Sequence, residues 1–135
     1  MIKIDNLKSA LKTLESGFAL LEKHKNSDVS DMLEDSCVKR FEYTLEAAIK
    51  LMKKILKQIY FIDEQELTVN NIFRLMDGYR FIASWENWRK CYQHRNNTSH
   101  EYNPNKSRDV VNILPLFIKD VTFFVSNLSK LKQND

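Results

Sequence analysis

The sequence predicts an all-α protein, an antiparallel up-and-down four-helix bundle whose third helix is broken into two segments. Two observations support this fold class. The chain of 135 residues holds only two Gly and two Pro, whereas an all-β domain needs turn residues about every 8–12 positions. Its long segments also repeat apolar residues at alternating spacings of three and four, which lines one face of a helix. We expect residues 1–135 to form a single domain, as chains of this length commonly do.

Composition is that of an ordinary globular protein, with 43% hydrophobic and 29% charged residues. The net charge of +3 and the pI near 8.8 are compatible with RNA or another polyanion but do not demand one. Cys37 and Cys91 match no metal or redox spacing, so we expect two reduced thiols within helices. We also expect no metal and no cofactor. The start of the chain lacks an apolar leader and no run reaches 18 apolar residues, which predicts a cytoplasmic protein without a membrane segment.

The first helix is expected over residues 5–25, where Asp5 or Asn6 can cap its start. Gly17 falls within the apolar pattern and is interpreted as a point of close packing against another helix. The segment 25–28 then breaks the chain, and Ser27, Asp28 and Ser30 are all plausible caps for the second helix. The apolar stripe of the first helix is formed by Leu7, Leu11, Leu14, Phe18 and Leu21.

The second helix is expected to continue to about residue 60 and to carry a heptad stripe suited to bundle packing. Leu51 and Tyr43 lie off this stripe and would widen the buried face or form a second surface. The stripe consists of Val38, Phe41, Leu45, Ala48, Met52, Ile55 and Ile59. The opposite side carries Lys50, Lys53, Lys54 and Lys57. These lysines form either a ridge that attracts phosphate or a solvated face placed favourably near the helix C-terminus.

The broken third helix begins after Thr68 or Asn70 and resumes at about residues 85–96 behind Ser84, a good N-cap. In the second segment Trp85, Trp88, Cys91 and Tyr92 follow helical spacing. We interpret these aromatic residues as core or interface rather than as a platform for stacking bases.

The last helix is expected to start at Asn103-Pro104, an N-cap followed by proline at the first helical position. Pro115 lies inside this helix and is expected to bend it, because it removes one backbone hydrogen bond. The apolar stripe comprises Val110, Leu114, Phe117, Val121, Phe124, Leu128 and Leu131.

The stretch from Arg95 to Tyr102, R-N-N-T-S-H-E-Y, lies between the last two helices and is dense in polar chemistry. Arg95 offers a planar, permanently charged fork that suits phosphate. His100 is the group here that exchanges protons near neutral pH. Such a pair suits phosphodiester chemistry that needs no metal, in which the RNA 2′-hydroxyl is the nucleophile. One histidine supplies half of an acid–base pair, so a two-fold dimer would complete the site. The alternative is that both side chains only satisfy the last carbonyls of a helix.

These residues carry a family resemblance. Arg95-x4-His100-x-Tyr102 resembles the R-x4-H-x-Y motif of HEPN-domain proteins, specifically the HepT-like toxins, many of which are known as nucleotidyltransferase substrate-binding proteins. Residues 40–46, R-F-E-Y-T-L-E, are similar to a second string of the family, R-F-E-Y-T-F-E. Trp85 and Trp88 also fit, and the resemblance covers roughly residues 5–130.

The resemblance implies a homodimer in which two copies of the motif line a cleft, and a metal-independent endoribonuclease acting on RNA. In this family Arg95 would bind the scissile phosphate, His100 would act as acid and base, and Asn96 would assist. Arg40 and Glu42 would border the cleft as RNA- or nucleotide-binding residues.

The resemblance also implies a partner, a minimal nucleotidyltransferase (MNT) that serves as the antitoxin. This enzyme would add AMP to Tyr102 and so block RNA by added bulk and charge. Our leading hypothesis from the sequence is therefore the toxin component of a HEPN/MNT toxin–antitoxin pair. The alternative is a non-catalytic substrate-binding subunit of a two-component nucleotidyltransferase.

Overall fold

The structure, a computed structural model, describes residues 2–98 and 102–132, apart from the side chains of Lys130 and Lys132. Within these ranges the chain is helical and contains no strand. The predicted all-α fold class is therefore confirmed. The elements are α1 (Asp5–Lys23), α2 (Ser30–Gln58), the short 3₁₀ helix η1 (Glu64–Glu66), α3 (Val69–Gly78), α4 (Trp85–Thr98) and α5 (Pro104–Lys132).

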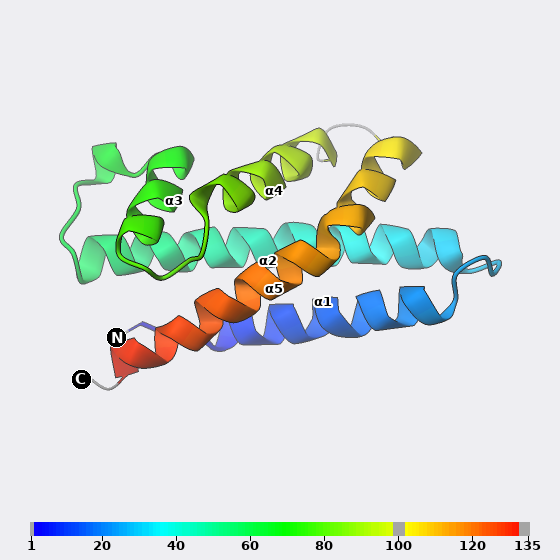
Figure 1. Cartoon of the computed structure of the whole chain (residues 1–135), viewed down its shortest axis with the longest axis horizontal. Coiled ribbons are helices and arrows are strands. Elements are labelled where there is room, and N and C mark those ends of the chain that lie inside the picture. The colour runs from blue at the N-terminus through cyan, green and yellow to red at the C-terminus, as the bar shows by residue number, and fades with distance from the viewer. Residues whose placement is uncertain (1, 99–101, 133–135) are drawn as a thin grey trace.

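The four longer helices, α1, α2, α4 and α5, alternate in direction, as Figure 1 shows. α1 and α2 lie side by side and antiparallel, while α3 and α4 together cover the other side of α2. α5 returns diagonally across the bundle and packs against α1, α2 and α4. The predicted up-and-down order, with the third helix divided between α3 and α4, is confirmed.

The predicted caps of the last three helices are confirmed. Thr68, Ser84 and Asn103 each accept a hydrogen bond from a backbone N–H in the first turn of the following helix. These bonds satisfy donors that have no partner within the helix itself.

The first two helices start without a side-chain cap, so the caps proposed for them were wrong. Asp5 is already helical, and Ile4 precedes it without a capping hydrogen bond. α2 likewise follows Val29, which cannot cap, and Ser30 is its first helical residue. The first turns of both helices include exposed residues, Asp5 and Asn6 in α1 and Asp31 and Met32 in α2, where water can satisfy free N–H groups.

The core is formed by the predicted stripes, which are buried almost throughout. Trp88, only 1% exposed, lies at the centre and contacts the rings of Phe73, Phe117 and Phe124. The prediction that this tryptophan is a core residue is confirmed. Leu51 is buried as well and widens the inner face of α2, whereas Ile59 follows the end of α2 and is 39% exposed. Ile59 therefore does not extend the stripe as predicted.

Close packing between α1 and α2 occurs at Gly17, as the sequence predicted. A Cβ atom at this position would lie 2.8 Å from Nη1 of Arg40. The same Arg40 nitrogen donates a hydrogen bond of 2.7 Å to the carbonyl oxygen of Thr13. The glycine therefore makes room for an arginine that joins the two helices.

The junction between α3 and α4 orients the segment that carries the polar stretch. The Asp77 carboxylate accepts a 2.8 Å hydrogen bond from the backbone N–H of Trp85, at the start of α4. The Arg74 guanidinium lies 4.3 Å from the centre of the Trp85 ring, a cation–π contact. The break in the third helix is thus held by specific contacts, and α4 leaves it in a fixed direction toward α5.

α5 is continuous through Pro115, and Figure 1 shows it changing direction in the part that precedes its midpoint. The predicted bend is therefore present. Across the described residues, no helix is both long enough and apolar enough to cross a membrane.

Candidate functional site

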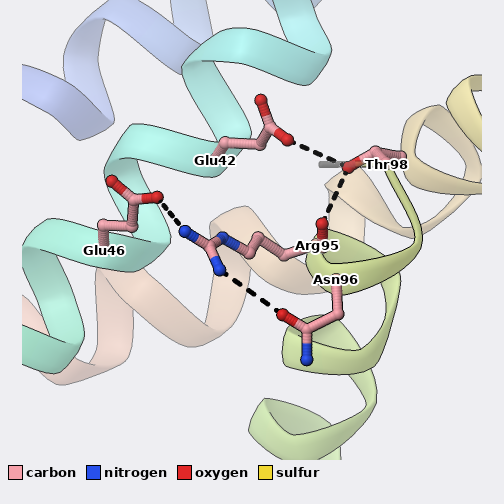
Figure 2. Close-up of polar contacts among 5 residues, drawn as sticks. All are labelled: Glu42, Glu46, Arg95, Asn96 and Thr98. Carbon is pink, nitrogen blue, oxygen red and sulfur yellow. Dashed lines mark hydrogen bonds and ion pairs between the residues drawn. The ribbon is translucent and has the colours of Figure 1, made fainter. Parts of the chain in front are cut away.

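The last turns of α4 lie against the middle of α2, and Arg95 forms the main contact between them. Its Nη2 donates to Oε1 of Glu46 in an ion pair, and its Nη1 donates to Oδ1 of Asn96 at 3.4 Å, as Figure 2 shows. The Arg95 side chain is 28% exposed and that of Glu46 is 54% exposed. The guanidinium is therefore held in a defined position at the surface, with a carboxylate as its counter-ion.

A second contact lies one turn closer to the C-terminus of α4 and one turn closer to the N-terminus of α2. The Thr98 hydroxyl is 3.1 Å from Oε2 of Glu42 and 3.0 Å from the Arg95 carbonyl oxygen, so its single proton is shared between two acceptors. Glu42 and Glu46 are four residues apart on α2, and their partners are three apart on α4. Residues at these spacings lie on one face of a helix. The two pairs together fasten the end of α4 to α2, and we call them the α2–α4 clamp.

The Arg95 guanidinium retains unused donor capacity. Its Nε is buried and has no hydrogen-bond acceptor among the described residues. Unpaired buried donors are uncommon and often mark a place where a ligand or water binds. The hydrogen bonds from the guanidinium nitrogens go to side-chain oxygens rather than to helix carbonyls. Between the described residues, no hydrogen bond from Arg95 to a helix carbonyl is therefore seen, and the choice between a site role and a role at the helix end stays a prediction.

A hollow of about 190 Å³ lies on one side of the clamp, and we call it the Tyr102 hollow. It brings Glu42 and Thr98 together with Tyr102, which follows α4 in the chain. Tyr102 is 72% exposed, so its phenol is open to an approaching macromolecule. The lining residues are Asp35, Val38, Lys39, Glu42, Thr98, Tyr102, Asn103 and Ser107.

A second hollow, of about 310 Å³, contains Arg95 itself and is called the Arg95 groove. Its walls come from α2, α3 and α4, and they combine apolar side chains with three cations and one carboxylate. The lining residues are Leu45, Glu46, Ile49, Lys50, Lys53, Val69, Tyr92 and Arg95. Open space therefore adjoins the guanidinium.

The structure brings four of the predicted site residues to this corner of the molecule: Arg95, Asn96, Glu42 and Tyr102. Arg40 lies elsewhere, since its guanidinium is directed at α1. Positions 40 and 42 differ by two residues, about 200° around a helix, so they cannot share a face. A nucleotide-binding role for Arg40 stays a prediction. The predicted acid–base residue His100 lies outside the described residues.

Sequence reasoning overlooked two members of the clamp, Glu46 and Thr98. The available signal was the spacing of Glu42 and Glu46, which puts both carboxylates on one face of α2. The sequence alone does not predict that this face of α2 packs against the end of α4.

The predicted lysine ridge is divided in the structure. Nζ of Lys53 and Nζ of Lys57 each lie 2.7 Å from one oxygen of Glu64 in η1. Hydrogen bonds from these two lysines lower the pKa of Glu64 to about 2. Lys50 and Lys54, in contrast, take part in no ion pair among the described residues and are exposed.

A buried polar cluster lies behind the site, between α4 and α5. Burial raises the pKa of Asp120, although a hydrogen bond from Asn87 partly opposes this shift. Burial also raises the pKa of the neighbouring Cys91 thiol to about 12, and the Asp120 charge adds to this effect. Cys37 and Cys91 are both buried and free of a disulfide, as predicted. In the part of the chain that the structure describes, no three His, Cys, Asp or Glu side chains gather as a metal site would require.

The fold and the clamp define a helical bundle with one polar corner, and comparison with known proteins places it in a family. The family described as "Nucleotidyltransferase substrate binding protein like" matches residues 2–130. The chain therefore belongs to this family, which confirms the resemblance found in the sequence. Among curated proteins, no match was found.

Solved structures that are similar in fold include the two described here. One, from Haemophilus influenzae, is described as a substrate-binding domain of a nucleotidyltransferase. It aligns with a TM-score of 0.83 at 24% identity, over 94% of this chain and 99% of the other. The second is a protein from Thermus thermophilus, with a TM-score of 0.67 at 22% identity, over 85% of this chain and 98% of the other. At these identities the similarity establishes the fold alone.

Proposed function

We propose that this chain is the toxin of a toxin–antitoxin pair, and that it is a metal-independent endoribonuclease paired with a nucleotidyltransferase. The observation that carries the proposal is the placement of Arg95. A guanidinium with an unpaired Nε is held at the edge of a groove, five residues before a histidine in the chain. The place of action is the cytoplasm.

In the proposed reaction the RNA 2′-oxygen attacks the adjacent phosphorus, and the bond from phosphorus to the 5′-oxygen breaks. His100 takes the proton of the 2′-hydroxyl, and a second imidazole gives a proton to the leaving 5′-oxygen. The products are a 2′,3′-cyclic phosphate and a 5′-hydroxyl. Arg95 stabilises the charge that develops on the phosphoryl oxygens, with Asn96 beside it. No electron transfer or external reagent is involved.

The second imidazole is supplied by a second copy of the chain. A two-fold dimer that places both Arg95–Tyr102 stretches in one cleft provides an acid and a base from a single type of histidine. Homodimerisation is therefore part of the proposal. Light scattering of the purified chain checks it, and a strictly monomeric chain that cleaves RNA would contradict the composite site.

Regulation is proposed to act through Tyr102. Its phenol oxygen would attack the α-phosphorus of ATP held by the nucleotidyltransferase, lose its proton and release pyrophosphate. The exposure of this side chain and its place beside the clamp support this role. An AMP group there adds a phosphate and a base beside Glu42 and Thr98 of the α2–α4 clamp, where they would oppose RNA by charge and bulk.

Cleavage of RNA by the purified chain in EDTA tests the activity. We expect Arg95→Ala and His100→Ala to lower the rate by about 100-fold or more, the range typical of losing one charge-stabilising or acid–base group. Arg89→Ala, an exposed arginine of the same helix, and His24→Ala are matched controls that should keep activity. If the two site variants cleave as fast as wild type, the assignment of catalysis to these residues is wrong.

The second candidate is a non-catalytic subunit that binds substrate for a nucleotidyltransferase. The ion pair between Arg95 and Glu46 favours it, because in the isolated chain the guanidinium charge is already balanced. The family description points the same way. This candidate is supported if the wild-type chain does not cleave RNA but binds a nucleotidyltransferase stably.

Intact mass spectrometry after incubation with the nucleotidyltransferase and ATP tests the modification. We expect additions of AMP that disappear in Tyr102→Phe and persist in Tyr43→Phe, a matched control in which another exposed tyrosine is changed. An unchanged mass of the wild-type chain removes the regulatory claim.

A further inference from the structure

A third hollow extends the charged surface away from Arg95. It measures about 210 Å³ and lies between the start of α1 and α2, and we call it the Lys54 hollow. Lys50 lines both this hollow and the Arg95 groove, so the two openings adjoin at that side chain. The residues lining the Lys54 hollow are Lys3, Asn6, Leu7, Ala47, Lys50, Leu51 and Lys54.

The charged residues along α2 form a line that runs from the Arg95 groove to the Lys54 hollow. Glu46, Lys50 and Lys54 are successive members of an i, i+4 series and therefore follow one face of the helix. The distance from position 46 to position 54 along the axis is about 12 Å at 1.5 Å per residue. A line of two lysines thus leads from the partner of Arg95 to the Lys54 hollow, where Lys3 adds a third positive charge.

Lys50 and Lys54 differ from the neighbouring lysines of α2 in that they form no ion pair among the described residues. Glu64 contacts both Lys53 and Lys57 at 2.7 Å, and its single negative charge offsets one of their two positive charges. Lys50 and Lys54 are exposed and form no ion pair among the described residues. Their charge is therefore available to an anion from outside.

The Arg95 groove suits one nucleotide unit of such an anion. Ile49, Val69 and Tyr92 provide apolar wall surface, and Arg95 and Lys50 provide cations. Ligand pockets hold small molecules from roughly 300 Å³ upward, so a groove of about 310 Å³ fits a single base with its phosphate. Apolar and aromatic surface beside phosphate-binding cations is the usual composition of a single-strand site.

We propose that the Arg95 groove, Lys50 and Lys54 form a binding track for single-stranded RNA. One nucleotide occupies the groove, and the adjoining phosphates follow Lys50 and Lys54 along α2. This inference rests on the proposed function, because it takes the phosphate at Arg95 to belong to RNA. It adds the direction in which the strand leaves the site and the residues that hold it.

The test measures binding rather than cleavage, with the full chain and a fluorescently labelled 2′-O-methyl RNA oligonucleotide that cannot be cut. For single strands, the logarithm of affinity falls with the logarithm of salt by about 0.7 per phosphate contact. Losing two contacts in Lys50→Gln/Lys54→Gln is therefore expected to lower the slope by about 1.4. If affinity at 1 M salt is unchanged, this slope corresponds to about 25-fold weaker binding at 0.1 M.

The matched control is Lys12→Gln/Lys23→Gln, which removes the same charge from exposed lysines of α1 that line neither opening. The proposal expects this variant to bind like wild type. Equal losses in both double variants would mean general electrostatics and would overturn the track. So would unchanged RNA binding in Lys50→Gln/Lys54→Gln, or a wild-type chain that binds no RNA. If Lys50→Gln/Lys54→Gln loses binding to the nucleotidyltransferase but keeps RNA binding, the two lysines bind an acidic protein surface instead of RNA.

Cleavage assays on the same variants separate this inference from the proposed function. A wild-type chain that binds RNA through Lys50 and Lys54 but never cleaves it would refute the ribonuclease and keep the track. Cleavage that depends on Arg95 but not on these lysines would refute the track and keep the ribonuclease.

Discussion

The ion pair between Arg95 and Glu46 leads to a prediction about RNA affinity. If the guanidinium receives a phosphate, the carboxylate of Glu46 competes with that phosphate for the same nitrogen. Glu46→Gln keeps the shape of the side chain and an acceptor oxygen but removes the charge. We therefore expect this substitution to strengthen RNA binding.

The size of the effect follows from the exposure of the pair. Both side chains are partly solvated, 28% for Arg95 and 54% for Glu46, and ion pairs of this kind contribute up to about 1 kcal/mol. Releasing Arg95 from such a competitor increases affinity by at most about fivefold, since 1.4 kcal/mol corresponds to tenfold. The same figure limits the loss of folding stability to about 1 kcal/mol.

Fluorescence anisotropy with the non-cleavable oligonucleotide measures the affinity. Glu22→Gln is the charge-matched control, because Glu22 also forms an exposed ion pair, with Lys25 at 3.0 Å, but lies on α1. The prediction requires tighter binding in Glu46→Gln than in this control. Affinity that stays equal or falls would show that Glu46 holds Arg95 in position for phosphate, and the competition argument would be refuted.

Three further predictions concern stability and reactivity. The folded chain lowers the pKa of Glu64 from 4.5 to about 2, so the stabilisation from the ionised Glu64 is present above pH 4.5 and is lost as the pH falls toward 2. In Glu64→Gln, the thermal midpoint should therefore decline less steeply between these two pH values. Burial raises the pKa of Asp120 above 3.8, so the ionisation of Asp120 opposes folding as the pH rises. The thermal midpoint of Asp120→Asn should therefore exceed that of wild type at neutral pH. The difference between the two midpoints should shrink below pH 3.8. Cys91, buried with a pKa raised to about 12, should react with a thiol reagent only after denaturation, and labelling in the native state would contradict its placement.

Most of the fold could be predicted because apolar periodicity is a property of each segment alone. Residues such as Phe41 and Phe117 recur at helical spacing, and the structure buries both, with ring centroids 4.8 Å apart. Caps that depend on a local hydrogen bond, such as Thr68, were also predictable. The cap predicted at Asp5 failed because a solvated helix end can use water instead.

The site was only partly predictable, because its contacts join segments that are far apart in the sequence. The chemistry of Arg95 follows from local sequence, but the partner of Arg95 lies 49 residues away on α2. Which face of α2 meets α4 depends on the packing of Trp88 and the angle of α4, and neither is encoded in the motif. The position of Arg40, in contrast, follows from local geometry, because two residues correspond to about 200° around a helix and place it on the other side from Glu42.

If the proposed modification of Tyr102 takes place, its position on the chain would let it affect the proposed RNA binding. Tyr102 lines the hollow that contains Glu42 and Thr98, whereas Arg95 lines a separate groove. The Thr98 hydroxyl contacts both Glu42 and the Arg95 carbonyl oxygen. Because an AMP group on Tyr102 is tethered to the chain, it would be present at high effective concentration at this corner of the molecule, whereas RNA must bind from solution. Glu46 already competes with any free phosphate for binding to Arg95. A tethered phosphate would therefore exclude RNA more completely than its single charge suggests, and it would do so without a change in the fold.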